Sequence, residues 1–344
     1  MQHPAKRQPG RGAGSEASRA GARERAVRTE DLFEQGEWTV PESDDLAIVI
    51  GLSKARCRVF DGVQERECLI PPQIAVRQKS ALAVGDRVLT EMADGVCRLA
   101  GIAARKTVLS RPDPINAHRQ RLIAANVDRV IHVVSIKAPP LRPRLIDRYL
   151  IAIQRGGAQP VICVNKIDLV DEVERRTQLA VLDPYRRLPV PVIAVSTRSG
   201  EGLDELKDLA RGHFCALVGH SGVGKSSILN ALDERLQIAT GELHRRGTGR
   251  HTTTSSTLHD LGDNTWIIDT PGIREFGLWD LDPATLRDYF PEFSEPGESC
   301  KFNDCTHLHE PGCEVKEQVE AGTLNRARYE TYVRLAEDLA EGNR

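Results

Sequence analysis

The order of two nucleotide-binding motifs constrains this 344-residue chain more than any other feature. Asn165-Lys166-Ile167-Asp168 comes before the glycine-rich segment Gly-His-Ser-Gly-Val-Gly-Lys-Ser at 219–226. In an ordinary guanine-nucleotide switch the glycine-rich phosphate loop comes first. The reversed order predicts a nucleotide-binding domain whose usual termini are joined and whose new ends open elsewhere, which is a circular permutation.

The segment 219–226 matches the pattern Gly-x-x-x-x-Gly-Lys-Ser at every defined position. Glycines let backbone N–H groups converge on phosphate oxygens, Lys225 supplies positive charge for the β- and γ-phosphates, and the Ser226 hydroxyl can ligate Mg²⁺. A strand-like run precedes the loop and a helical run follows it, as the motif requires. We therefore predict nucleotide contacts from Gly219, His220, Ser221, Gly222, Val223, Gly224, Lys225, Ser226 and Ser227.

The Asn-Lys-x-Asp motif predicts guanine specificity. The Asp168 carboxylate can accept hydrogen bonds from guanine N1–H and the exocyclic amine, a donor pair that adenine lacks. Asn165 and Lys166 would brace the base and the loop, and Ser196 and Thr197 follow the next predicted strand, where a second loop would close over guanine. The alternative is a solvated loop with balanced charge.

Asp269-Thr270-Pro271-Gly272 follows another predicted strand. Asp269 would hold Mg²⁺ through water, and the Gly272 N–H would meet the γ-phosphate. Between the two phosphate motifs, 238–257 is polar, glycine-rich and basic, as expected of a mobile switch loop. Thr253, with Thr252 as the alternative, would complete the Mg²⁺ shell. These threonines would also suit the start of a β-strand.

Ile273 stands where small GTPases often carry a glutamine that orients water. Isoleucine cannot hydrogen-bond a water molecule, so we expect slow intrinsic hydrolysis or a substitute group. His251 is the nearest candidate, and a contact with solvent or RNA is its equally weighted alternative. The predicted catalytic residues are therefore His251, Lys225 and Thr253.

A cysteine cluster near the C-terminus predicts a metal site. Three thiolates and one imidazole, from Cys300, Cys305, His307 and Cys313, suit a closed tetrahedral structural Zn²⁺ site. His309 is a competing imidazole, and free thiols are the alternative, since a reducing compartment disfavours a disulfide there. The other cysteines lie in apolar, strand-like segments and read as small core residues. They are Cys57, Cys68, Cys97, Cys163 and Cys215.

The pattern along the chain predicts four parts. Residues 1–40 should be a disordered basic arm, because 1–28 carry seven Lys or Arg against two Glu and few large apolar side chains. Residues 41–107 contain five short β-rich runs, at 46–51, 55–60, 67–70, 86–90 and 95–100, which predict an OB-fold barrel. Residues 108–280 alternate strands with helices, and 281–344 should form a small zinc-binding helical domain.

The fold class expected is therefore α/β, with a circularly permuted P-loop GTPase domain between the barrel and the zinc domain. The barrel face could bind oligonucleotides or could serve only as a spacer. The arm could dock on nucleic acid or could be a solubilising tail. We find neither a membrane-spanning apolar run nor a secretory signal, so a cytoplasmic location without membrane contact is expected.

The permuted motif order, the N-terminal barrel and the Cys₃His cluster together resemble the bacterial ribosome small-subunit-dependent GTPase family. The resemblance covers nearly the whole chain after about residue 40 and includes Arg-Gly-Thr-Gly-Arg-His-Thr-Thr-Thr at 246–254. It implies a GTPase that acts in late small-subunit maturation, binds rRNA and is stimulated by the small subunit. It also implies that His251 assists the attacking water.

The expected activity is hydrolysis of GTP to GDP and phosphate by a monomer whose partners are the small ribosomal subunit and its rRNA. Two alternatives remain open at this point. One is an RNA-binding assembly factor with a regulatory GTP site and incidental hydrolysis. The other is a permuted GTPase of the large subunit, although such a protein is not expected to carry the cysteine cluster.

Overall fold

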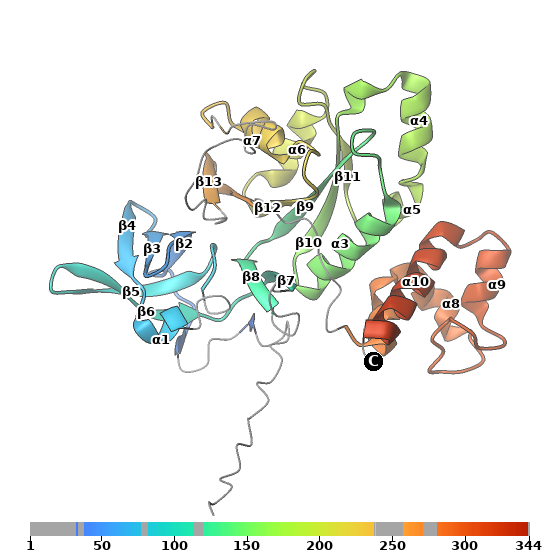
Figure 1. Ribbon diagram of the computed structural model, residues 1–344, viewed down its shortest axis with the longest axis horizontal. Helices are drawn as coiled ribbons and strands as arrows, with labels where there is room; N and C mark the ends of the chain where they lie inside the picture. The colour runs from blue at the N-terminus through green and yellow to red at the C-terminus, as the bar shows by residue number, and fades with distance from the viewer. Residues whose placement is uncertain are drawn as a thin grey trace, which may run out of the picture.

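The computed structural model describes residues 32–33, 38–76, 82–112, 120–236, 238, 257–270 and 281–342. Figure 1 shows three parts: a β-barrel near the N-terminus, a central sheet with helices on both faces, and a C-terminal group of helices packed against α3. Within the described residues, no helix combines the length and apolar character needed to cross a bilayer.

The N-terminal strands close into an OB-like barrel. Five strands pair in the circular order β6-β4-β3-β2-β5 and back to β6, with the β4–β6 pair parallel and the others antiparallel. Each of the five predicted β-rich runs overlaps one of these strands. The bounds are β1 Thr39–Val40, β2 Ala47–Leu52, β3 Arg56–Phe60, β4 Glu65–Leu69, α1 Pro72–Val76, β5 Arg87–Ala93 and β6 Val96–Ala103.

Alternation of side chains along the strands builds the barrel interior. On β3, Cys57 and Val59 point into the core, whereas Arg56 and Arg58 on the outer face are exposed. The cysteines predicted as core residues are buried, but Cys68 and Cys97 also form a disulfide between β4 and β6. Sequence spacing did not predict this pairing, because it does not reveal which strands become neighbours.

A short hairpin links the barrel to the central domain. Its strands, β7 Val108–Pro112 and β8 Gln120–Ala125, are antiparallel. An isolated bridge between Val84 and Ala124 and a buried ion pair between Arg105 and Asp86 hold this junction together.

The central sheet has the order β11-β10-β9-β12-β14-β13, with every pair parallel except β13–β14. The central strands are nearly continuous runs of Val, Ile, Leu and Ala, as expected of strands covered on both faces. Their bounds are β9 Arg129–Ser135, β10 Gln159–Asn165, β11 Val192–Ala194, β12 Phe214–Val218, β13 Thr257–Gly262 and β14 Thr265–Asp269.

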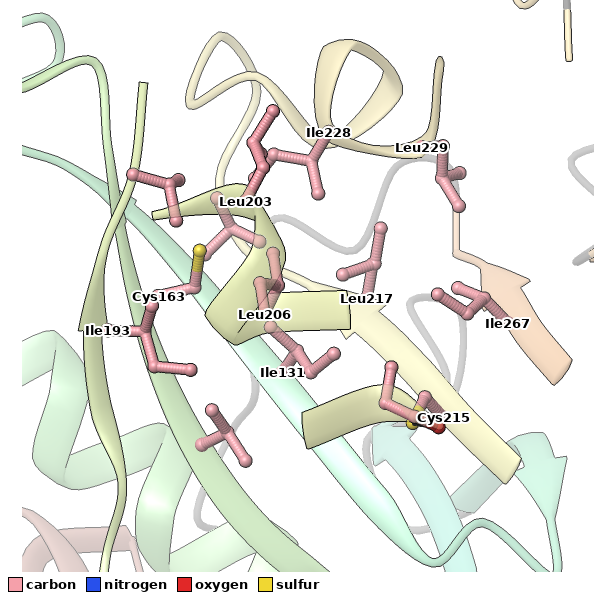
Figure 2. Packing of buried hydrophobic residues seen from close by; sticks show 14 of the residues in the cluster. Ile131, Cys163, Ile193, Leu203, Leu206, Cys215, Leu217, Ile228, Leu229 and Ile267 are labelled. Atoms are coloured by element: carbon pink, nitrogen blue, oxygen red, sulfur yellow. Dashed lines mark hydrogen bonds between the residues drawn. The ribbon is translucent and has the colours of Figure 1, made fainter. Parts of the chain in front are cut away.

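Helices α6 Leu203–Ala210 and α7 Lys225–Leu232 cover one face of this sheet. Figure 2 shows Leu203, Leu206, Ile228 and Leu229 of these helices packed over Leu217 and other strand residues. Burying each such side chain stabilises the fold by about 1.5–3 kcal/mol. The other face is covered by α3 Pro143–Arg155 and by the segment of η3 Ile167–Leu169, α4 Glu172–Ala180 and α5 Asp183–Arg186.

The C-terminal part is helical, as predicted. Tyr332, Ala336 and Leu339 of the last helix are buried in a cluster with Phe290 and Phe293. The elements are η5 Pro283–Tyr289, η6 Pro291–Phe293, α8 Ser294–Glu298, α9 Glu314–Glu320 and α10 Arg326–Gly342.

Candidate functional site

The phosphate loop lies between the carboxyl end of β12 and the first turn of α7. Two of its glycines have no room for a side chain. A Cβ on Gly219 would lie 2.3 Å from the Val133 carbonyl oxygen, and one on Gly224 would lie 2.3 Å from Asn165 Nδ2. Both residues have positive φ, at 142° and 99°, which favours glycine. The loop therefore packs directly against the two neighbouring strand ends, at the start of a helix whose N–H groups suit phosphate.

Lys225 begins α7, and its ammonium group is held within the loop. Its Nζ donates hydrogen bonds to the carbonyl oxygens of Gly219 at 2.6 Å and His220 at 3.0 Å. Burial lowers the pKa of Lys225 from its ordinary value, and the nearby Asp269 carboxylate partly offsets this effect. The positive charge is thus placed where a phosphate chain would follow the loop, near the carboxylate predicted to hold Mg²⁺. Ser226 and Ser227 lie half-buried in the first turn of α7.

Asn165 and Lys166 tie the end of β10 to the phosphate loop. Asn165 is buried, and its side-chain amide donates to the Val223 carbonyl oxygen at 3.0 Å. Lys166 has φ 65°, and its Nζ donates to the carbonyl oxygens of Ala138 at 2.7 Å and Gly222 at 2.5 Å. These two side chains fix the spacing between the loop predicted to read the base and the loop predicted to hold the phosphates.

The two loops predicted to contact guanine meet at Asp168 and Ser196. The Ser196 hydroxyl donates to Asp168 Oδ1 at 2.6 Å and accepts hydrogen bonds from the backbone N–H groups of Arg198 and Ser199. Ser196 is buried, whereas Asp168 is exposed and Thr197 is half-buried. Ser196 therefore holds one oxygen of the Asp168 carboxylate, and the exposed part of this group is available to a ligand.

The remaining phosphate-side residues lie only partly within the described chain. Asp269 ends β14, beside β12 and the phosphate loop. The buried Thr270 hydroxyl donates to the Leu217 carbonyl oxygen at 2.5 Å. His251, Thr252, Thr253, Gly272 and Ile273 lie outside the described residues.

The cysteine cluster brings four ligand atoms together. Cys300, Cys305, His307 and Cys313 each offer one atom, and all four atoms lie within 4.8 Å of one another. His307 Nδ1 lies 3.5 Å from Cys313 Sγ and 3.7 Å from Cys300 Sγ. The competing His309 is exposed and is not a member of this group. A Cys₃His set of this size fits one tetrahedral metal ion, because Zn–S and Zn–N bonds are about 2.0–2.3 Å long.

Glu310 organises the loop that carries His307. Its carboxylate accepts hydrogen bonds from the backbone N–H groups of Thr306, Leu308 and His309 and from the Thr306 hydroxyl. Although burial acts to raise the pKa of Glu310, these hydrogen bonds lower it to about 2. The ionised carboxylate therefore shapes the turn in which His307 adopts φ 60°.

Sequence reasoning missed a buried charge cluster that joins α10 to the central domain. Arg328 Nη1 lies 2.5 Å from Asp147 Oδ1 on α3, and Arg328 Nε lies 2.6 Å from Glu292 Oε1. The guanidinium also stacks near the rings of Phe290, at 4.6 Å, and Tyr185, at 5.2 Å. Burial opposes the charge on Arg328, but Asp147 and Glu292 raise its pKa above the ordinary value. No local motif reveals a group assembled from three separate segments.

The phosphate loop and the two predicted base-reading loops converge at the carboxyl edge of one sheet, where open α/β sheets bind ligands. They occur along the chain in reversed order. This fold and site define a circularly permuted GTPase. A family model described as RsgA GTPase matches residues 102–279. The chain belongs to the RsgA GTPase family.

Relatives and solved structures agree with this assignment. A small ribosomal subunit biogenesis GTPase RsgA of Chlorobaculum parvum is 39% identical over 82% of this chain and 93% of that protein. A Haemophilus influenzae protein of the same name is 39% identical over 77% of this chain and 78% of its own. The crystal structure of YjeQ from Thermotoga maritima has a TM-score of 0.70 and 31% identity, covering 86% of this chain and 98% of that one. YloQ, a circularly permuted GTPase, has a TM-score of 0.67 and 26% identity, covering 86% and 95%.

Proposed function

We propose that this GTPase acts as a switch in late maturation of the small ribosomal subunit, hydrolysing GTP to GDP and phosphate when it is bound there. The observation that carries the proposal is the 39% identity to proteins named small ribosomal subunit biogenesis GTPase, in one case across 93% of the relative's length. The subunit is accordingly the proposed activating partner.

Guanine is proposed to bind against Asp168, with Ser196 and Thr197 closing over it. The hydrogen bond from Ser196 supports this role, because it orients the carboxylate toward its exposed side. Asn165 and Lys166 are proposed to hold this base-binding loop against the phosphate loop, which their hydrogen bonds to Val223 and Gly222 support.

The phosphates are proposed to bind in the loop of residues 219–224, where Lys225 neutralises charge that develops on the β- and γ-phosphates. The neighbouring Ser226 and Asp269 fit Mg²⁺, a hard cation that prefers oxygen ligands. When bound, Mg²⁺ would supply positive charge that offsets the negative charge of the phosphates. Gly272, Thr253 and His251 are proposed to sense the γ-phosphate, complete the metal shell and position water, respectively. Their support is their place in the sequence motifs.

The metal at the Cys₃His cluster is proposed to be one structural Zn²⁺. Thiolate and imidazole are ligands that zinc prefers, and four protein ligands leave no open position for substrate. The ion would stabilise the fold of 281–344, a part of the chain that is otherwise rich in short helices.

Contacts with rRNA are proposed for the barrel and for the basic arm of residues 1–28, which lies outside the described residues. Arg56 and Arg58 on the outer barrel face support the first of these contacts. We also propose a monomer, a cytoplasmic location, and the division of the chain at 107 and 280. The arm, predicted to reach residue 40, ends earlier, because β1 Thr39–Val40 pairs with β6 of the barrel sheet. Binding should weaken as salt rises, because neutralised phosphates release counterions.

Turnover of GTP with purified small subunits, large subunits or neither tests the proposal. We expect slow turnover alone and an acceleration of about 10³–10⁵ with small subunits only. Equal rates in all three reactions would favour an RNA-binding factor with incidental hydrolysis. Acceleration by large subunits instead would favour the alternative of a permuted GTPase that acts on the large subunit.

A further inference from the structure

One aromatic side chain on the outer face of the barrel packs against the GTPase domain. Phe60 ends β3, where it shares the outer face with the exposed Arg56 and Arg58. Its ring lies 5.5 Å, centroid to centroid, from the ring of Trp266, with the planes tilted by 50°. Both side chains are half-buried. A ring pair at this separation is favourable beyond the apolar area it buries.

A second apolar contact accompanies the ring pair. Leu52, at the end of β2, packs against both the barrel core and the apolar cluster on the face of the central sheet that α3 covers. Leu258 of β13 packs against that same cluster. Strands β2 and β13 also lie next to each other, as Figure 1 shows. The barrel thus meets the GTPase domain along the β13–β14 hairpin.

This hairpin lies next to the nucleotide site. Trp266 is the second residue of β14, and the same strand ends at Asp269, the residue proposed to help hold Mg²⁺. The paired strand β13 begins at Thr257, opposite Asp269, shortly after Thr253 in the sequence. A paired strand moves as a unit, because its backbone hydrogen bonds and packed side chains resist local deformation. A displacement at Trp266 is therefore transmitted toward Asp269.

The outer face of β3 is suited to respond to a polyanion. The guanidinium groups of Arg56 and Arg58 pair with Glu67 at 2.6 Å and Glu65 at 3.2 Å, and all four side chains are exposed. Exposed ion pairs of this kind contribute little stability, so phosphates can replace the carboxylates. Phosphate groups bound to these arginines would lie on the same strand face as Phe60.

We propose that Phe60 and Trp266 couple the barrel to the GTPase site, so that nucleic acid bound on the outer face of β3 favours the hydrolytic arrangement at Asp269. This inference rests on the proposed function, since small-subunit rRNA is the partner. Phe60 and Trp266 are positioning residues that act through β14. Because coupling free energies are reciprocal, the nucleotide state must also change the conformation or the dynamics of β3.

Stimulated turnover measures the coupling in one direction. At saturating small subunits, Phe60→Ala should lower kcat about tenfold, a typical size for such coupling. Its unstimulated rate should stay within about twofold of wild type, and any change in its affinity for subunits should be no larger than the coupling factor itself. Phe60→Tyr, which keeps the ring, should restore the stimulated rate, and Val63→Ala, at the exposed β3–β4 turn, is the matched control. An unchanged kcat for Phe60→Ala, or a change in subunit affinity alone, would overturn the proposal.

Amide hydrogen exchange measures the coupling in the other direction and needs no ribosome. In wild type, exchange in Arg56–Phe60 should differ between complexes with GDP and with a non-hydrolysable GTP analogue. Phe60→Ala should remove that difference, and Val63→Ala should retain it. Identical exchange in both wild-type complexes would contradict the coupling. If subunits fail to stimulate the wild type, the proposed function fails, and this exchange measurement still decides the coupling.

Discussion

The Ser196 hydroxyl donates a hydrogen bond to the Asp168 carboxylate, with 2.6 Å between Ser196 Oγ and Asp168 Oδ1. Two loops that follow different strands are thereby joined at the group proposed to read guanine. Because Ser196 also accepts two backbone hydrogen bonds, its hydroxyl is fixed in orientation and so fixes the carboxylate.

Removal of this hydroxyl should weaken guanine-nucleotide binding. Ser196→Ala leaves the carboxylate unsupported and two backbone donors without their partner, a loss of about 1–2 kcal/mol. We expect GDP affinity to fall roughly tenfold, measured by fluorescence titration with a labelled nucleotide. Ser199→Ala changes an exposed hydroxyl in the same loop and should bind normally. Equal affinities for wild type and Ser196→Ala would show that Asp168 needs no such support.

Base choice should depend on Asp168 itself. Asp168→Asn replaces an acceptor pair by one acceptor and one donor, which suits xanthine better than guanine. Loss of charged hydrogen bonds of this kind costs about 1.5–3 kcal/mol, so GTP affinity should fall at least tenfold while affinity for xanthosine triphosphate rises. Competition between the two nucleotides measures both changes. Asp204→Asn, on the exposed side of α6, is the control, and unaltered GTP preference would exclude Asp168 from specificity.

His251 should matter for stimulated hydrolysis and not for binding. His251→Ala removes the side chain proposed to position water in place of a glutamine, so the rate with small subunits should drop by about 10²–10³. Nucleotide affinity should stay within about twofold of wild type, because no base or phosphate contact is proposed for His251. Steady-state turnover and titration are compared with His213→Ala. His213 directly precedes β12, at the end of the strand opposite to the phosphate loop. A normal stimulated rate would assign His251 another role.

Glu310 should set metal affinity without being a ligand. Glu310→Gln weakens the acceptor for three backbone N–H groups and the Thr306 hydroxyl, so the turn that presents His307 is less well ordered. Changes of this kind around metal ligands typically lower affinity about 10–100-fold. Competition with a chromogenic chelator measures zinc retention, with Glu298→Gln as the exposed control. Identical retention would leave Glu310 with no part in the metal site.

Arg328 should be the largest single contributor to holding α10 against α3. Arg328→Leu leaves Asp147 buried without its countercharge, and breaking a buried pair in this way costs about 3–5 kcal/mol. The midpoint of urea unfolding, followed by circular dichroism, should fall accordingly. Arg326→Leu, at the exposed first residue of α10, should change it little. A stability equal to wild type would mean that apolar packing alone joins the two parts.

What the sequence could predict depended on how local each signal was. The phosphate loop and Asn165–Asp168 are contiguous, and each needs only a strand ahead of it, so the amino-acid sequence was enough to place both at one sheet edge. The central strands could be recognised from their Val, Ile and Leu residues, because each strand is also one contiguous segment. Their residue-level roles stay predictions until binding and turnover are measured.

Features assembled from distant segments could not be predicted in this way. Arg328 and Asp147 are separated by 181 positions, and neither lies in a recognisable pattern. The Cys68–Cys97 disulfide depends on β4 and β6 becoming neighbours although two other elements, α1 and β5, intervene along the chain. Strand β13 was anticipated only through the alternative that the threonines at 252–253 begin a strand, because its own residues, Thr257–Gly262, mix polar and apolar side chains at the edge of the sheet.

The permuted strand order changes which parts of the molecule are covalent neighbours. Along the described residues β14 is the last strand of the sheet, and the motif proposed to detect the γ-phosphate is followed in sequence by the metal-binding helices. In an unpermuted switch that turn is followed by further strands of the same sheet. Here the barrel precedes the GTPase domain and the metal-binding helices follow it. A force on either of these two appended domains therefore reaches the central sheet through the backbone.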